Sequence, residues 1–200
     1  MHRLGLTVLC VLTIRAVAHA APAPEIPRKL PDGYVALPFV NESGVRSLDW
    51  MRIGLPVALS EQLEFHPGLR TTASLDTVVS AAHKDVVQAA HAAHARYVWT
   101  GTYRRPNWKL EISVQLWSVS GDDKVLVGAK TARGDFSDVY DLLDDAIVSL
   151  CAAAGHPLPP EAGERLARLP TKDFYAFTLY GRGLMSLVGV DGLSDPVKAE

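Results

Sequence analysis

The stretch from residue 97 to residue 118 constrains the fold more than any other part of the chain. Its side chains alternate between apolar and polar along two runs, 97–104 and 109–118, which is the period of a half-buried β-strand. Between the runs lies Arg105-Pro106-Asn107-Trp108, a sequence typical of a turn. The stretch therefore predicts an antiparallel hairpin with Pro106 and Asn107 as its central turn residues.

The turn position predicts a register that gives the hairpin one apolar and one polar face. The cross-strand pairs expected are Tyr103 with Leu110, Trp99 with Val114, and Tyr97 with Leu116. The apolar face would carry Tyr97, Trp99, Tyr103, Leu110, Ile112, Val114 and Leu116. The polar face would carry Thr100, Thr102, Arg104, Lys109, Glu111, Ser113 and Gln115. A slip of one residue would exchange the faces, so this pattern specifies which side meets the core.

The remaining elements place this hairpin in an α/β (α+β) fold. A turn at 120–123 and a strand at 124–130 extend the hairpin to a meander, and apolar runs at 34–39 and 69–73 predict two further strands. Helical periodicity is expected over Leu55–Leu63, Leu75–Ala82, Val86–His94, Val139–Leu150 and Asp173–Val188. Pro56 is expected in the first turn of its helix, where a missing N–H costs nothing. The prediction is a mixed sheet with a C-terminal antiparallel meander, helices packed on it and a helical tail.

The N-terminus predicts export. Arg3 precedes the apolar run Leu4–Ile14, and Ala18-His19-Ala20 places small residues before a cleavage point. Residues 1–20 are therefore expected to be a signal peptide, and the protein periplasmic. Arg15 lies late in the apolar region, so an uncleaved anchor is the alternative. No comparable apolar stretch recurs, so the mature chain is expected to lack a transmembrane segment. Without residues 1–20 the chain keeps 18 basic and 22 acidic residues, a net charge of −4, which argues against a nucleic-acid partner.

The rest of the chain divides into four expected parts. Residues 21–33 are Pro-rich and predict a flexible leader, and residues 34–155 form the α/β domain. Residues 156–171 contain four prolines and predict a linker, and residues 172–200 begin a helical region that is expected to continue in the natural protein. Cys151 lies in an apolar run, where a buried, unreactive thiol is expected.

The sequence contains no recognisable catalytic constellation, so no enzyme activity and no cofactor are expected. The carboxylate pairs Asp122-Asp123 and Asp144-Asp145 suit a turn and a helix surface. The histidines His83, His91 and His94 raise a metal-carrier alternative, because two of them share a helix face. They lack a nearby Cys or carboxylate cluster to complete a ligand set, so no metal site is predicted.

Arg104, Arg105, Trp108 and Trp117 are the candidate partner-binding residues. Trp108 falls in the predicted turn beside two arginines, and Trp117 falls on the polar face of the hairpin. Exposed tryptophan and arginine are enriched at protein interfaces. The alternative is a polar turn whose charges and proline simply protect a sheet edge.

The order of elements resembles the TolB-like N-terminal domain, seen also in FlgO-type and CsgG-type periplasmic proteins. The resemblance covers about residues 34–155 and rests on these segments: Val35–Asn41, Gly54-Leu55 with Leu59 and Leu63, Pro67–Arg70, Ala95–Tyr103, Leu110–Trp117, Val125–Lys130 and Asp138–Leu150. His94 departs from the family, which usually has glycine at this helix end. Tyr175–Met185, with Tyr180-Gly181-Arg182-Gly183, resembles the first helix of a tetratricopeptide region, and Asp195-Pro196 would begin the next.

The resemblance, the export signal and the missing catalytic motifs together predict a non-catalytic periplasmic interaction or scaffold module of the cell envelope. Its partners would be envelope proteins, with any outer-membrane association made through them. The alternative is a small-ligand sensor that binds a nucleotide or cell-wall fragment in a cleft beside Asn41 to Gly44. The sequence leaves the partner and the oligomeric state open.

Overall fold

The computed structural model describes residues 32–64, 66, 68–71, 84–160 and 173–188. The expected signal peptide, most of the leader, the helix at 75–82, most of the linker and the end of the helical region lie outside these residues. Everything below concerns the described part of the chain.

A mixed sheet forms the centre of the domain, as predicted, and it has six strands rather than the five expected. Its strands are β1 (Asp32–Ala36), β2 (Val40–Asn41), β3 (Leu69–Thr71), β4 (Tyr97–Arg104), β5 (Leu110–Ser120) and β6 (Asp123–Gly134). The order is β3-β1-β4-β5-β6, with β2 beside β4. β1 runs parallel to both β3 and β4, whereas β4, β5 and β6 form the expected antiparallel meander. The short strand β3 and the long strand β6 are therefore the two edges.

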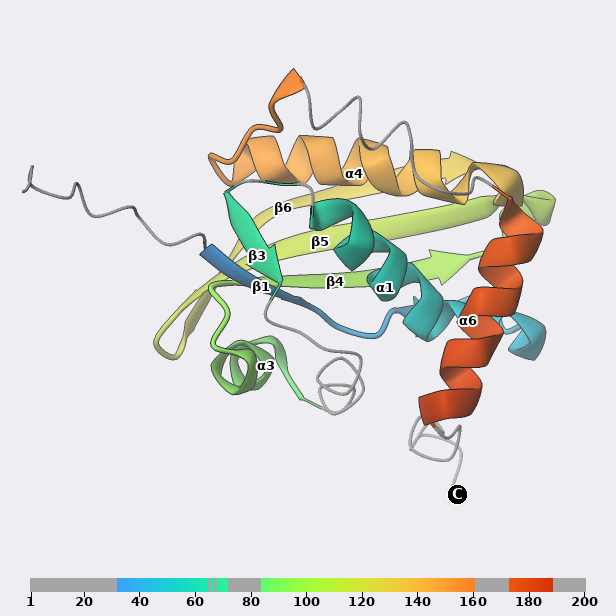
Figure 1. Ribbon diagram of the computed structural model, residues 1–200, viewed down its shortest axis with the longest axis horizontal. Coiled ribbons are helices and arrows are strands. Elements are labelled where there is room, and N and C mark those ends of the chain that lie inside the picture. The colour runs from blue at the N-terminus through green and yellow to red at the C-terminus, as the bar shows by residue number, and fades with distance from the viewer. Residues whose placement is uncertain (1–31, 65, 67, 72–83, 161–172, 189–200) are drawn as a thin grey trace, which may run out of the picture. The chain divides into compact units, whose positions relative to one another are not determined.

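Helices cover both faces of the sheet (Figure 1). They are α1 (Met51–Leu63), α3 (Val86–Ala93), α4 (Val139–Ala153) and α6 (Phe174–Val188). Helices α1, α4 and α6 enclose the larger core, which contains the whole predicted apolar face of the hairpin. Helix α3 packs on the opposite face over a small cluster that includes Val35, Val98 and Val119. Strand β1 is thus buried on both faces, as its apolar sequence predicts.

The predicted hairpin register is wrong by two residues. Tyr103 lies opposite Ile112, Trp99 opposite Leu116, and Tyr97 opposite Ser118. The connection is longer than a two-residue turn because two-residue hairpins need a positive φ at their first central residue, and the proline ring holds φ near −65°. A shift by two keeps every side chain on its face, so the predicted division of the two faces is correct.

Pro56 lies inside α1 rather than in its first turn, because the helix begins at Met51. A proline there leaves the carbonyl four residues earlier, that of Arg52, without its helical donor. The backbone N–H of Phe39 supplies a donor instead, at 2.9 Å from the Arg52 oxygen. The Phe39 N–H, between β1 and β2, and the Arg52 carbonyl, which Pro56 leaves without a helical donor, therefore satisfy each other's hydrogen-bonding capacity.

The Phe39 side chain fixes the local spacing of the sheet. Its ring lies over Gly101 of β4, where a Cβ atom would come within 2.5 Å of the ring. Only glycine leaves room for this close approach. Packing against Phe39 therefore explains why the predicted strand 97–104 contains a glycine at position 101.

The predicted ends of α3 and the predicted start of α4 agree with the structure. The Asp85 side chain caps α3 by accepting a hydrogen bond from the Gln88 N–H, at 2.9 Å. His94 ends α3 with φ of 50°, the left-handed conformation that glycine most often adopts at helix ends. Asp135 and Asp138 form a capping box ahead of α4. Gly155, with φ of 78°, follows the C-terminal end of α4.

The helix expected from residue 173 forms and packs on the domain as α6. Phe174 and Phe177 contact the indole of Trp50, with ring centroids 6.1 Å and 5.1 Å away. Gly181 lies so close to the same indole that a Cβ atom would overlap it. Tyr180 also donates a hydrogen bond to Glu61 of α1 at 2.9 Å, and Phe177 contacts the ring of Tyr140, so this part of the expected helical tail packs on both α1 and α4.

Candidate functional site

The β4–β5 connection, residues 105–109, forms an exposed tip at one end of the sheet. Pro106–Trp108 make a short 3₁₀ turn, but Asn107 and Trp108 have φ of 52° and 64°. Asparagine tolerates this left-handed conformation, whereas it is an outlier for a bulky residue such as tryptophan. The backbone at Trp108 is therefore strained.

Trp108 is 78% exposed and gains almost no burial in exchange for this strain. The Arg105 guanidinium stacks on its ring, with Cζ 4.5 Å from the centroid. Such a cation–π contact holds both side chains in one arrangement. Arg133, from the neighbouring strand β6, donates a long hydrogen bond of 3.4 Å to the Pro106 carbonyl. The tip thus presents an indole flanked by two guanidinium groups.

The other cations at this end of the sheet are paired with carboxylates. Arg104 donates to Glu111 at 2.7 Å, and Lys109 lies 2.7 Å from Asp135. Among the residues described, neither Arg105 nor Arg133 has a carboxylate partner. The uncompensated positive charge of the tip therefore belongs to these two arginines.

Trp117 does not belong to the tip, although the sequence groups it with Trp108. It lies near the far end of β5, half-buried against the cluster under α3. Its indole N–H donates to the Thr100 hydroxyl at 3.1 Å, and the Lys124 ammonium lies 5.6 Å from its ring centroid. The structure brings Arg104, Arg105 and Trp108 together, adds Arg133, and separates Trp117 from them.

The polar groups of the loop at Asn41–Gly44 form hydrogen bonds within the loop and with the residues that follow it. The Asn41 carbonyl oxygen accepts from the Ser43 N–H at 2.9 Å, and its amide donates to Asp49 at 2.7 Å. The Ser43 hydroxyl in turn accepts from the Val45 N–H at 3.1 Å. These bonds hold the loop in a turn and occupy the groups that a small ligand would need.

The histidines of the metal-carrier alternative are not gathered by the described structure. His83 lies outside it, while His91 contacts the Gly121 carbonyl at 2.8 Å and His94 ends its helix. Over the described residues, no group of three or more His, Cys, Asp or Glu side chains is placed to hold a metal ion. In the carboxylate pairs, Asp144 binds the buried amide of Gln62 and Asp145 pairs with Lys130.

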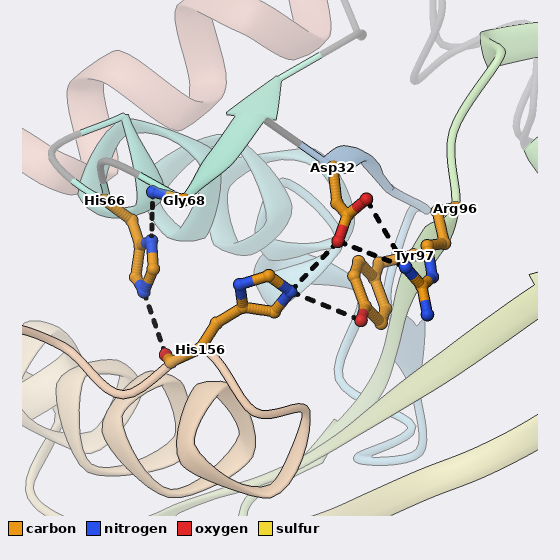
Figure 2. Close-up of polar contacts among 6 residues, drawn as sticks. All are labelled: Asp32, His66, Gly68, Arg96, Tyr97 and His156. Atoms are coloured by element: carbon orange, nitrogen blue, oxygen red, sulfur yellow. Dashed lines mark hydrogen bonds and ion pairs between the residues drawn. The ribbon is translucent and has the colours of Figure 1, made fainter. Parts of the chain in front are cut away.

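A second polar cluster, which the sequence did not suggest, joins four separate parts of the chain (Figure 2). His156 Nε2 lies 3.1 Å from Asp32 Oδ2 and 3.3 Å from the Tyr97 hydroxyl. Arg96 Nη1 lies 3.3 Å from the same Asp32 oxygen. His66 contacts the backbone carbonyl of His156 at 2.9 Å. The cluster thus joins the start of β1, the start of β4, the end of α1 and the segment after α4.

Hydrogen bonding assigns most of these groups a structural task. The Gly68 N–H donates to His66 Nδ1 at 3.0 Å, so the proton of this buried imidazole lies on Nε2 and is donated to the His156 carbonyl. Burial raises the pKa of Tyr97, an effect that Arg96 opposes, so the phenol stays protonated near neutral pH and cannot act as a base.

The sequence offers little that could have found this cluster. Asp32 falls in the expected leader and His156 in the expected linker, and the two are 124 positions apart. Their contacts extend the packed domain beyond the expected bounds of 34–155 at both ends. Leu158 also packs on the larger core.

No family model and no curated protein match this chain. Among solved structures, TolB from Acinetobacter baumannii is similar at 14% identity and TM-score 0.44, covering 63% of this chain and 29% of that one. A PelC dodecamer from Paraburkholderia phytofirmans is similar at 14% identity and TM-score 0.39, covering 60% and 89%. The LpoB C-terminal domain from Salmonella enterica has 14% identity and TM-score 0.27, covering 52% and 82%.

These likenesses concern the coarse fold and carry no argument about partners. TolB belongs to the family that the sequence resembles, and this chain spans under a third of its length. In the part of the chain that the structure describes, no helix combines the length and apolarity needed to cross a membrane.

Proposed function

We propose that this chain is a non-catalytic periplasmic module that binds a protein partner of the cell envelope through its β4–β5 hairpin tip. The observation that carries the proposal is Trp108, which is both 78% exposed and held at φ of 64°. The residues of the contact are Arg104, Arg105, Trp108 and the newly found Arg133. Trp117 is left out, because it lies away from the tip.

Folding stability does not account for Trp108. A strained backbone conformation of this kind costs about 1–3 kcal/mol. A buried tryptophan would more than offset that cost, but this one leaves most of its surface in water. Strain that is kept without a gain in stability is found at binding and switching sites. The indole is therefore best explained by contact with something outside the chain.

The tip is also arranged in advance for binding. The Arg105 stack, the Arg133 bond to the Pro106 carbonyl and the fixed ring of Pro106 all limit the loop before a partner arrives. Binding then orders fewer groups, which lowers its entropic cost. Tryptophan and arginine are also the residue types that dominate binding energy at interfaces.

The expected compartment comes from residues 1–20 and belongs to the proposal. So does the absence of catalysis, which is supported by the structural tasks of the His156 cluster. The small-ligand alternative at Asn41–Gly44 is less favoured, since that loop satisfies its own hydrogen-bonding groups.

Site-specific photo-crosslinking in the organism's own cells tests the proposal. A benzophenone amino acid would replace Lys109, which adjoins Trp108 in an extended backbone conformation, and Asp122 in the opposite hairpin turn would be the matched control position. We expect a discrete adduct from position 109, its loss in Trp108→Ala, and none from position 122. No adduct at 109, or one that persists unchanged in Trp108→Ala, would remove the tip as the binding site.

A further inference from the structure

We infer that the surface recognised by the hairpin tip is an acidic protein segment, whose carboxylates bind Arg105 and Arg133 while an apolar side chain covers Trp108. This inference rests on the proposed function and names the chemistry of the partner. It depends on how charge is distributed around the tip.

Three residues form a row across the sheet next to the tip. Arg104 of β4 is directly opposite Glu111 of β5, and Glu111 is directly opposite Arg133 of β6. Glu111 accepts a hydrogen bond from Arg104, whose Nε lies 2.7 Å from Glu111 Oε1. One carboxylate therefore lies between two arginines and neutralises only one of them.

The tip is a local reversal of the protein's charge. Arg104 is paired with Glu111 and Lys109 with Asp135, which leaves Arg105 and Arg133 as the two cations of the tip without a carboxylate partner among the described residues. The whole chain has a net charge of −2. An acidic partner would be attracted to these two arginines, which favours docking at the tip in one orientation.

The donors of the two unpaired arginines suit a carboxylate. Arg105 Cζ lies 4.5 Å from the centroid of the Trp108 ring, and a guanidinium over an aromatic ring can still donate its N–H groups to other acceptors. Arg133 gives one nitrogen to the Pro106 carbonyl, and no other acceptor contacts it in the described structure. A guanidinium edge offers two parallel N–H groups at the spacing of carboxylate oxygens.

An anionic membrane fits this tip less well than a protein does. Each Lys or Arg near an acidic bilayer contributes about 1 kcal/mol, so a charge of +2 with one tryptophan gives only weak attachment.

The four tryptophan indole N–H groups provide a direct readout by NMR, with the Trp108 signal assigned from Trp108→Phe. The folded protein from residue 21 onwards would be titrated with a short peptide of alternating Glu and Leu. Its isostere with Gln in place of Glu, and vesicles of phosphatidylglycerol, are the two controls.

We expect the acidic peptide to shift the Trp108 signal saturably and leave the buried Trp99 signal in place. The Gln peptide should bind at least about tenfold more weakly, and so should Arg105→Gln or Arg133→Gln with the acidic peptide. Arg182→Gln, in an exposed part of α6, should change nothing. Equal binding of both peptides, or a shift with vesicles alone, would overturn the inference. If position 109 still cross-linked through Trp108, the proposed function would survive that result.

Discussion

His156 Nε2 lies 3.1 Å from Asp32 Oδ2, which joins the segment after α4 to the first strand of the sheet. Both side chains are largely buried, with 18% and 13% of their surface exposed. A pair in this setting contributes more than a surface ion pair, because less water competes for either group.

Removing one partner should therefore be costly. We expect His156→Ala to lower the free energy of unfolding by about 0.5–1.5 kcal/mol, since it removes one of the hydrogen-bond partners of the part-buried Asp32 carboxylate, which still pairs with Arg96. Urea unfolding would measure this, with His91→Ala, an exposed histidine, as the control. A double-mutant cycle with Asp32→Asn isolates the pair itself. Additive effects would mean that the contact contributes nothing.

Two glycines of α6 should respond to alanine with opposite signs. At Gly181 a Cβ atom would overlap the Trp50 indole, whereas at Gly183 it would meet no atom within 4 Å. Gly181→Ala should destabilise the protein by about 1–3 kcal/mol through overpacking. Gly183→Ala should stabilise it by about 0.5–1 kcal/mol, because alanine loses less entropy in a helix. Thermal unfolding of both variants tests the packing of α6 on α1. Equal changes in the melting temperature of the two variants would contradict that packing.

The Cys151 thiol should be inert until the protein opens. Burial raises its pKa from about 9.0 to about 12, so the folded state holds almost no thiolate at pH 8. A thiol reagent should label the protein from residue 21 onwards only at the rate of opening. Ser186→Cys, placed on an exposed part of α6 in a Cys151→Ala background, should react at once. Rapid labelling of native Cys151 would show that the core is more open than described.

The same shift predicts how stability changes at high pH. The unfolded thiol ionises near pH 9 and the folded one only near pH 12, so ionisation favours the unfolded state between them. The free energy of unfolding should fall as pH rises through this window. Cys151→Ala should lose less stability between pH 8 and pH 10 than the unaltered protein. The buried Tyr34 and Tyr103, whose pKa values burial also raises, act in the same direction in both proteins.

Trp108 should be dispensable for folding. Trp108→Gly releases backbone strain of about 1–3 kcal/mol and loses a cation–π contact of about 0.5–1 kcal/mol. We expect the free energy of unfolding to stay level or rise, while cross-linking at the tip is lost. Trp50→Ala, in the core, should by contrast cost about 3–5 kcal/mol. A fall of similar size in Trp108→Gly would show that this indole is a structural residue.

Local patterns predicted most of the fold because they report on local physics. The alternation over 97–118 fixed which side chains face the core, since that depends only on odd or even position. It did not fix the register, which depends on the backbone conformation around Pro106. The start of α1 was predicted wrongly because a proline such as Pro56 is usually found in the first turn of a helix. Pro56 is tolerated inside α1 because the Phe39 N–H, distant in sequence, bonds to the Arg52 carbonyl.

The same distinction between local and long-range contacts applies to the candidate sites. Trp108 and Arg105 were predicted because they are neighbours in an exposed turn. Arg133 was missed because only the β5–β6 register brings it to the tip, and that register includes an irregularity opposite Leu116 and Trp117. His156 and Asp32 meet only through the complete fold, and neither carries a local signal for the other.

The continuity of β5 has a mechanical consequence. This strand runs from Leu110 beside the tip to Ser120 beside the turn that His91 contacts, bonded along both edges by β4 and β6. Its hydrogen bonds lie perpendicular to its axis, so a force applied to the tip along that axis would load all of them at once in shear. A force applied across the sheet would instead peel β6 away one bond at a time. The tip is therefore anchored most firmly against a load that pulls in line with the strands.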